Sequence, residues 1–200
     1  MIIRLALTSA AALALAACGG DADADADAPL AEDTSAMADA TPDAAAPDPA
    51  TPQGFVATAA SSDMYEIEAG RLAQEMGSSQ EVKDFGAMMV RDHTASSDKL
   101  KEAVANGGAE LAVPPAMLPK HQQQLDALRN AGDGFDSLYI QQQQMAHQEA
   151  LTLLQDQAES GTVASLKAFA AEVAPVVEGH LEHVQGLSAG AAGDATGSAQ

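Results

Sequence analysis

The sequence predicts an all-α fold, built as an antiparallel four-helix bundle with an extra short helix. Residues 55–187 are rich in Ala, Gln, Glu, Leu and Met and poor in β-branched runs, which favours helices over strands. Glycines divide this region into helical segments with short connections. Short connections place consecutive helices side by side in opposite directions, and the region is long enough for one hydrophobic core.

The first two expected helices are separated by a turn with a capping signal. The first helix is expected over about 55–76 and stops at Gly77. Ser78 and Glu81 have the Ser-x-x-Glu spacing of a capping box, in which the two side chains satisfy backbone N–H groups of the first turn. The second helix therefore begins here, and it should end near the Asn-Gly-Gly run at 106–108.

One short and two long helices are expected in the rest of the domain. A proline-containing loop crosses to a short amphipathic helix, which ends at Asp133 and Gly134. The next helix is expected over 135–160 and the last over 163 to about 187. Pro175 lies inside the last helix and should kink it, because proline removes one backbone hydrogen bond.

The N-terminus has the pattern of a lipoprotein signal peptide over residues 1–17. Arg4 is followed by an uncharged stretch that is too short to be a permanent membrane span. The run Leu-Ala-Ala-Cys ending at Cys18 resembles the lipobox of lipoprotein signal peptidase, which implies cleavage before Cys18 and acylation of that residue. The alternative is an ordinary signal peptide that contains a cysteine by chance. Cys18 is the only cysteine, so it has no intramolecular disulfide partner.

Acylation at Cys18 would make the membrane a partner of this protein, since several acyl chains on one residue anchor a protein firmly. Gly19, rather than aspartate, follows the cysteine, which resembles the outer-membrane sorting default of Gram-negative bacteria. We therefore expect a lipid-anchored protein of the cell envelope, at the outer membrane and facing the periplasm. The sequence indicates no particular protein partner.

Residues 18–54 are expected to be a disordered tether, because they are acidic, rich in Ala, Asp and Pro, and nearly free of large apolar side chains. A disordered tail is expected over 188–200, which has no periodicity. The whole chain has 29 Asp and Glu against 9 Lys and Arg, a formal charge of −20 that disfavours nucleic acid as a partner. The single cysteine excludes a zinc site built from several thiolates.

Each of the four long helices places one potential metal ligand on an apolar stripe. On the first helix, Glu68 lies four residues from both Met64 and Leu72, whereas Glu66 points to another face. The other three candidates share stripes with large apolar residues of their own helices: His93 with Met89 and Leu100, His147 with Ile140 and Leu151, and His180 with Val177 and Leu181.

One carboxylate and three imidazoles facing a bundle interior suit a single first-row transition-metal ion. The alternative is that each inward histidine is a core residue bonded to a backbone carbonyl or a neighbouring acid, and periodicity does not show whether the four side chains lie at the same depth. No Gly-rich phosphate loop, Gly-x-Ser-x-Gly elbow or Ser/His/Asp arrangement is present, so no catalytic residues are assigned.

Two long segments carry a resemblance to a known family. The runs EIEAGRLA at 66–73 and VKDFGAMMVRDH at 82–93 resemble the family named domain of unknown function 4142, and FDSLY at 135–139 and LKAFA at 166–170 agree with it. The resemblance covers 55–187 in essence. It implies a ferritin-like helical bundle, usually exported and often lipid-anchored, with no established activity.

The chain departs from the di-metal pattern of ferritin-like proteins, which carry Glu-x-x-His pairs on two helices. Val90, Gln144 and Val177 stand three residues before the three candidate histidines, so a single ion is expected in place of a carboxylate-bridged di-iron centre. Two functions remain open. The first is an envelope lipoprotein that binds a metal ion or small ligand in stress protection; the second is a structural or interaction lipoprotein whose histidines only organise the core.

Overall fold

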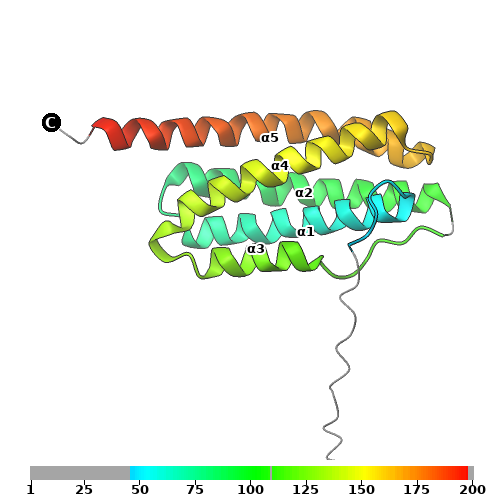
Figure 1. Cartoon of the computed structure of the whole chain (residues 1–200), viewed down its shortest axis with the longest axis horizontal. Helices are drawn as coiled ribbons and strands as arrows, with labels where there is room; N and C mark the ends of the chain where they lie inside the picture. The colour runs from blue at the N-terminus through cyan, green and yellow to red at the C-terminus, as the bar shows by residue number, and fades with distance from the viewer. Residues whose placement is uncertain (1–45, 109, 198–200) are drawn as a thin grey trace, which may run out of the picture. The chain divides into compact units, whose positions relative to one another are not determined.

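The computed structural model describes residues 46–108 and 110–197, with side chains through Ser188 (Figure 1). The expected signal peptide, Cys18 and most of the tether lie outside these residues. The described helices, including one short 3-10 turn, are α1 (Pro52–Met76), α2 (Gln80–Gly107), α3 (Pro119–Arg129), η1 (Gly132–Gly134), α4 (Phe135–Ser160) and α5 (Ala164–Gly197). The described ranges contain no strand, and the predicted all-α fold is confirmed.

The helices associate mainly as two sequential pairs, α1 with α2 and α4 with α5. The α2–α5 and α1–α4 contacts join the two pairs, and the short helix α3 packs on α1 and α4 (Figure 1). The four long helices and one short helix of the sequence prediction are therefore present. None of the described helices is long and apolar enough to cross a membrane.

Helix α1 begins earlier than the sequence suggested, at Pro52, so residues 52–54 belong to the folded domain and not to the tether. Thr51 caps the helix, since its Oγ1 accepts a hydrogen bond from the Gly54 N–H at 3.1 Å. The backbone N–H of Thr51 in turn donates to the carbonyl of Asp48. At the other end of the domain, α5 continues to Gly197, where the sequence indicated a tail without periodicity.

The turn between α1 and α2 is fixed by two acceptors. Ser79, one residue later than expected, caps α2 by accepting from the Val82 N–H at 3.2 Å. The backbone N–H groups of Ser78 and Ser79 donate to the two carboxylate oxygens of Asp136, each at 2.9 Å. Because Asp136 lies in the first turn of α4, this contact ties the α1–α2 turn to the start of α4.

Small residues let α1 and α2 approach until their backbones touch. A Cβ atom on Gly70 would lie 2.5 Å from the Gly86 carbonyl oxygen, and one on Gly86 would lie 2.7 Å from the Gly70 carbonyl oxygen. The buried face of α1 accordingly carries Ala59, Ala69 and Ala73. Met64 and Leu72, the larger residues that the sequence analysis placed inward, are only half-buried.

The core consists of two apolar clusters with a polar layer between them. Phe55, Leu100, Leu166 and Phe169 belong to the first cluster, and Phe85, Met89, Leu125, Phe135 and Leu181 belong to the second. On each of three helices a buried histidine stands between residues of the two clusters: His93 on α2, His147 on α4 and His180 on α5. The polar layer therefore crosses the interior of the domain.

Candidate metal centre

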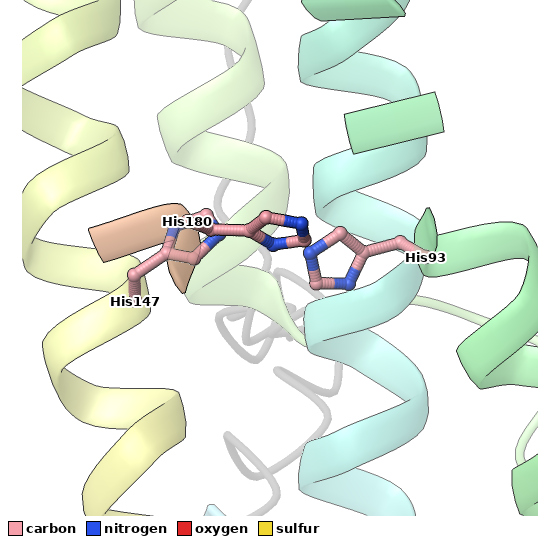
Figure 2. Close-up of side chains that lie close together, drawn as sticks. All are labelled: His93, His147 and His180. Carbon is pink, nitrogen blue, oxygen red and sulfur yellow. The ribbon is translucent and has the colours of Figure 1, made fainter. Parts of the chain in front are cut away.

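Three of the four predicted ligands meet in this polar layer. His93, His147 and His180 are each at most 4 % exposed, and each offers one potential ligand atom within 4.8 Å of the others. Figure 2 shows the three side chains converging from α2, α4 and α5. Their ring centroids are 5.4 to 5.7 Å apart, so no other side chain fits between the rings. The prediction that these three histidines face one interior is confirmed.

Each of these imidazoles uses one ring nitrogen to donate a hydrogen bond to an oxygen acceptor. His93 donates through Nδ1 to Asp63 Oδ1 at 2.8 Å, and His180 through Nε2 to Asp92 Oδ2 at 3.0 Å. His147 donates through Nδ1 to the backbone carbonyl of Gln143 at 2.9 Å. Because carboxylate and carbonyl oxygens only accept, these bonds fix the tautomer of each neutral ring.

The opposite nitrogens have no hydrogen-bond partner among the described residues. His93 Nε2, His147 Nε2 and His180 Nδ1 are all buried and unpartnered. In the neutral tautomers fixed above, each of these atoms presents a lone pair. Buried polar atoms nearly always have a partner, and leaving one without costs about 1–3 kcal/mol. Three such atoms in one place are what a bound cation would satisfy.

Burial and neighbouring charges shift the pKa values of the three histidines in different directions. Burial, with the charge of His93, lowers the pKa of His147 to about 3. Burial also lowers the pKa of His180, against the hydrogen bond from its ring to Asp92. Burial acts on His93 in the same direction, but the hydrogen bond and charge of Asp63 outweigh it and raise the pKa of His93. At neutral pH, His147 and His180 are therefore uncharged, as a metal ligand must be.

The fourth predicted ligand, Glu68, does not join the cluster, and its predicted inward position is wrong. Its side chain is 42 % exposed and pairs with Arg71 one turn later on α1. The buried acids of α1 are Asp63 and Glu66, at 5 % and 1 % exposure. The sequence analysis followed the large apolar residues of α1, whereas the helix buries its small residues against α2, so the inward acid was assigned to the wrong face.

Glu66 lies one layer behind the histidines. Its carboxylate accepts a hydrogen bond from Gln143 Nε2, and Oε1 lies 3.8 Å from His147 Nδ1. Burial raises the pKa of Glu66 to about 7, although His93 and Gln143 act to lower it. Gln143 is fully buried. The carbonyl of Gln143 orients His147 while its side chain holds Glu66.

Asp63, Glu66, Asp92 and Gln143 were not predicted as site residues. One signal for Asp92 was present, because it is adjacent to the inward His93. Arg91 binds both carboxylate oxygens of Asp92, at 2.8 and 3.0 Å, and so holds it against His180. The small-residue spacing of α1 was the signal for Asp63 and Glu66. Hydrogen-bonded oxygens behind ligating histidines commonly orient the rings and raise their basicity.

The fold and the site define an all-α helical domain with a buried three-histidine cluster that could hold a metal ion. The chain belongs to the family Domain of unknown function (DUF4142), whose model matches residues 35–187. The match includes the region in which the sequence resemblance was found and extends toward the N-terminus. Comparison with curated proteins and with solved structures gives no match.

Proposed function

We propose that the domain binds one divalent first-row transition-metal ion through His93 Nε2, His147 Nε2 and His180 Nδ1. The observation that carries the proposal is the convergence of three buried histidines, each of which offers one ring nitrogen within 4.8 Å of the others. Each of them also has one buried ring nitrogen without a hydrogen-bond partner among the described residues. Imidazole nitrogen is a good ligand for Zn²⁺, Cu²⁺, Fe²⁺ and Ni²⁺. The side-chain set does not select among these ions.

The three histidine side chains would need to move only a little to bind an ion. Metal–nitrogen bonds of about 2.0–2.1 Å in a tetrahedral site place the ligand nitrogens roughly 3.4 Å apart. One nitrogen of each ring already lies within 4.8 Å of the others, so small side-chain rotations would close the site. The carboxylates of Asp63 and Asp92 behind two of the rings would offset the charge of the ion.

The direct test is metal analysis of untagged protein, followed by titration of the metal-free protein with Zn²⁺. We expect one ion per chain. Because the ion binds the folded state, saturation at about 100 times Kd should stabilise the protein by about 2.7 kcal/mol and raise Tm by roughly 10 °C. Absence of uptake at neutral pH, or a Tm that does not move, would contradict the proposal.

A structural role is the second candidate, and two contacts favour it. The Asp63–His93 bond joins α1 to α2, and the Asp92–His180 bond joins α2 to α5. If these bonds are the whole purpose of the cluster, each histidine organises the core and no ion is needed. Replacement of His93 would then cost only ordinary core stability, with Tm insensitive to chelator.

We also propose that the domain is held in the cell envelope by acylation of Cys18, with a role in envelope stress protection. The proposal rests on the lipobox pattern in the sequence. Cys18→Ser should move the protein from the detergent phase to the aqueous phase after phase partition, or leave the precursor unprocessed. A strain that lacks the protein should also be more sensitive to excess metal. An unmodified mature N-terminus away from Cys18, found by mass spectrometry in the wild type, would contradict the anchor.

A further inference from the structure

Two cavities adjoin the histidine cluster. The larger has a volume of about 110 Å³ and lies between α2 and α5, with His93 and His180 among its lining residues. The smaller, about 20 Å³, is lined by His93, Asp63 and residues of α4 and α5. His93 therefore lines both cavities.

The larger cavity leads toward the surface. Asp92, Ala95 and Lys99 line it from α2, and Val176 lines it from α5. Ala95 is exposed, Val176 is 42 % exposed, and Lys99 forms an exposed ion pair with Glu172 of α5 at 2.7 Å. Because these residues stand at the surface, the α2–α5 crevice gives the two histidines a route to solvent.

Among the residues that the structure describes, three histidines are available as ligands for an ion at this cluster. The described residues add no fourth His, Asp or Glu to the group, and the carboxylates of Asp63 and Asp92 already accept from the outer nitrogens of the rings. A metal site with three protein ligands keeps one position for water or an external ligand. The cavity of about 110 Å³, whose lining includes Asp92, Ser96 and Lys99 beside apolar residues, has room for several waters.

Resting on the proposed metal site, we infer that its fourth coordination position opens into the α2–α5 cavity and takes an exchangeable small monodentate ligand, a water that a small anion can replace. The exchange is a substitution: the bond from the water oxygen to the ion breaks, and a bond from the anion forms. The charge of the ion favours an anion at this position, whereas Asp92 and Lys99, which both line the crevice, bring opposite charges to it.

The test uses azide on the full-length protein, purified in detergent without a histidine tag and loaded with Co²⁺. The visible absorption of Co²⁺ reports both its stoichiometry and its coordination. We expect one Co²⁺ per chain and a saturable change in its spectrum on addition of azide. Ala95→Leu should narrow the cavity and weaken azide binding roughly tenfold, the scale of steric overpacking, with Co²⁺ still bound.

Ala105→Leu is the matched control, since Ala105 is exposed on the same helix but does not line the cavity. It should bind azide as the wild type does. If Co²⁺ is not taken up, the metal site itself fails and this inference fails with it. If one Co²⁺ binds but azide leaves its spectrum unchanged, or if the two leucine variants bind azide equally, the metal site stands and the open position in this cavity is overturned.

Discussion

The domain contains two kinds of buried histidine environment, the three-histidine cluster and the contact of His121 with α1. His121 is 4 % exposed, as buried as the cluster residues. Its Nδ1 is hydrogen-bonded to Ser61 Oγ at 2.6 Å, and its ring stacks on Tyr65 with centroids 5.3 Å apart. Ser61 Oγ also accepts from the Leu118 N–H, so this contact fixes the start of α3 on α1.

The difference shows that burial alone does not mark a ligand. His121 forms a hydrogen bond with a hydroxyl group and stacks on an aromatic ring, and these contacts account for its burial without a metal ion. In the cluster, each ring donates from one nitrogen to an oxygen and lies beside two further imidazoles, and its other nitrogen has no partner among the described residues. The arrangement of partners around each ring, and not its depth, separates a candidate metal site from a helix contact.

The largest expected effect is the loss of metal binding on removal of one cluster histidine. His147→Phe keeps a ring of similar shape but removes both nitrogens, so Zn²⁺ affinity should fall by at least about 100-fold, the upper end of the loss seen when a residue behind a ligand is removed. The same substitution at His121 should leave Zn²⁺ affinity unchanged. Competition with a chromophoric chelator measures both, with circular dichroism to verify folding. Equal Zn²⁺ affinities in His147→Phe and His121→Phe would contradict the assignment of the cluster, rather than His121, to metal binding.

A smaller effect is expected for the oxygens behind the rings. Asp63→Asn and Asp92→Asn should each weaken Zn²⁺ binding about 10–100-fold, because the rings lose the charged acceptors that orient them. Glu68→Gln should have no effect, since Glu68 pairs with Arg71 at the surface. Isothermal titration of the three variants gives the comparison. A loss of Zn²⁺ affinity in Glu68→Gln as large as in Asp63→Asn would contradict the assignment of Asp63, and not Glu68, to the face of α1 that meets the cluster.

The smallest expected effect is the loss of folding stability at low pH that comes from the protonation of His121. Burial, aided by the charge of Lys120, lowers the pKa of His121 to about 4, whereas an unfolded histidine titrates near 6.5. Between these values the unfolded state binds more protons, so the contribution is complete above about pH 6.5 and is lost as pH falls toward 4. With allowance for solvent screening, the loss should be about 1–2 kcal/mol.

This pH dependence is measured by urea denaturation at pH 7 and pH 4.5, in the presence of a chelator. His121→Phe cannot take up the proton, so its stability should fall less than that of the wild type over the same interval. The cluster histidines are the same in both proteins, so their contribution to the pH dependence cancels in the comparison. Parallel losses in the two proteins would show that His121 is not held neutral by the fold.

Much of the fold could be predicted because its signals are local. Gly77 and Gly161 end α1 and α4 where the sequence placed those ends. The inward position of His93 followed from the large apolar residues on either side of it in α2. His147 and His180 followed in the same way, since α4 and α5 also bury leucine or valine beside them. The ferritin-like arrangement of the helices stays a prediction.

The features of the site that the sequence analysis missed depend on contacts between helices, which the residue pattern of a single helix does not show. Glu68 was misplaced because α1 meets α2 through Gly70 and Gly86, and a face of small residues has little apolar signal. Gln143 was not predicted as a site residue because its amide N–H donates to Glu66, a residue of another helix. The equal depth of the three histidines follows from how α2, α4 and α5 are shifted along one another.

The three cluster histidines belong to helices that are distant in sequence, and the chain has a single cysteine. An ion held between them would act as a removable crosslink in a protein that cannot form an internal disulfide. It would join α5 to α4, its partner in the pair, and to α2 of the other pair, so its withdrawal should loosen α5. Amide hydrogen exchange in α5 should then be slow in the loaded protein and faster after chelation, while α1 and α2 keep their own close backbone contact.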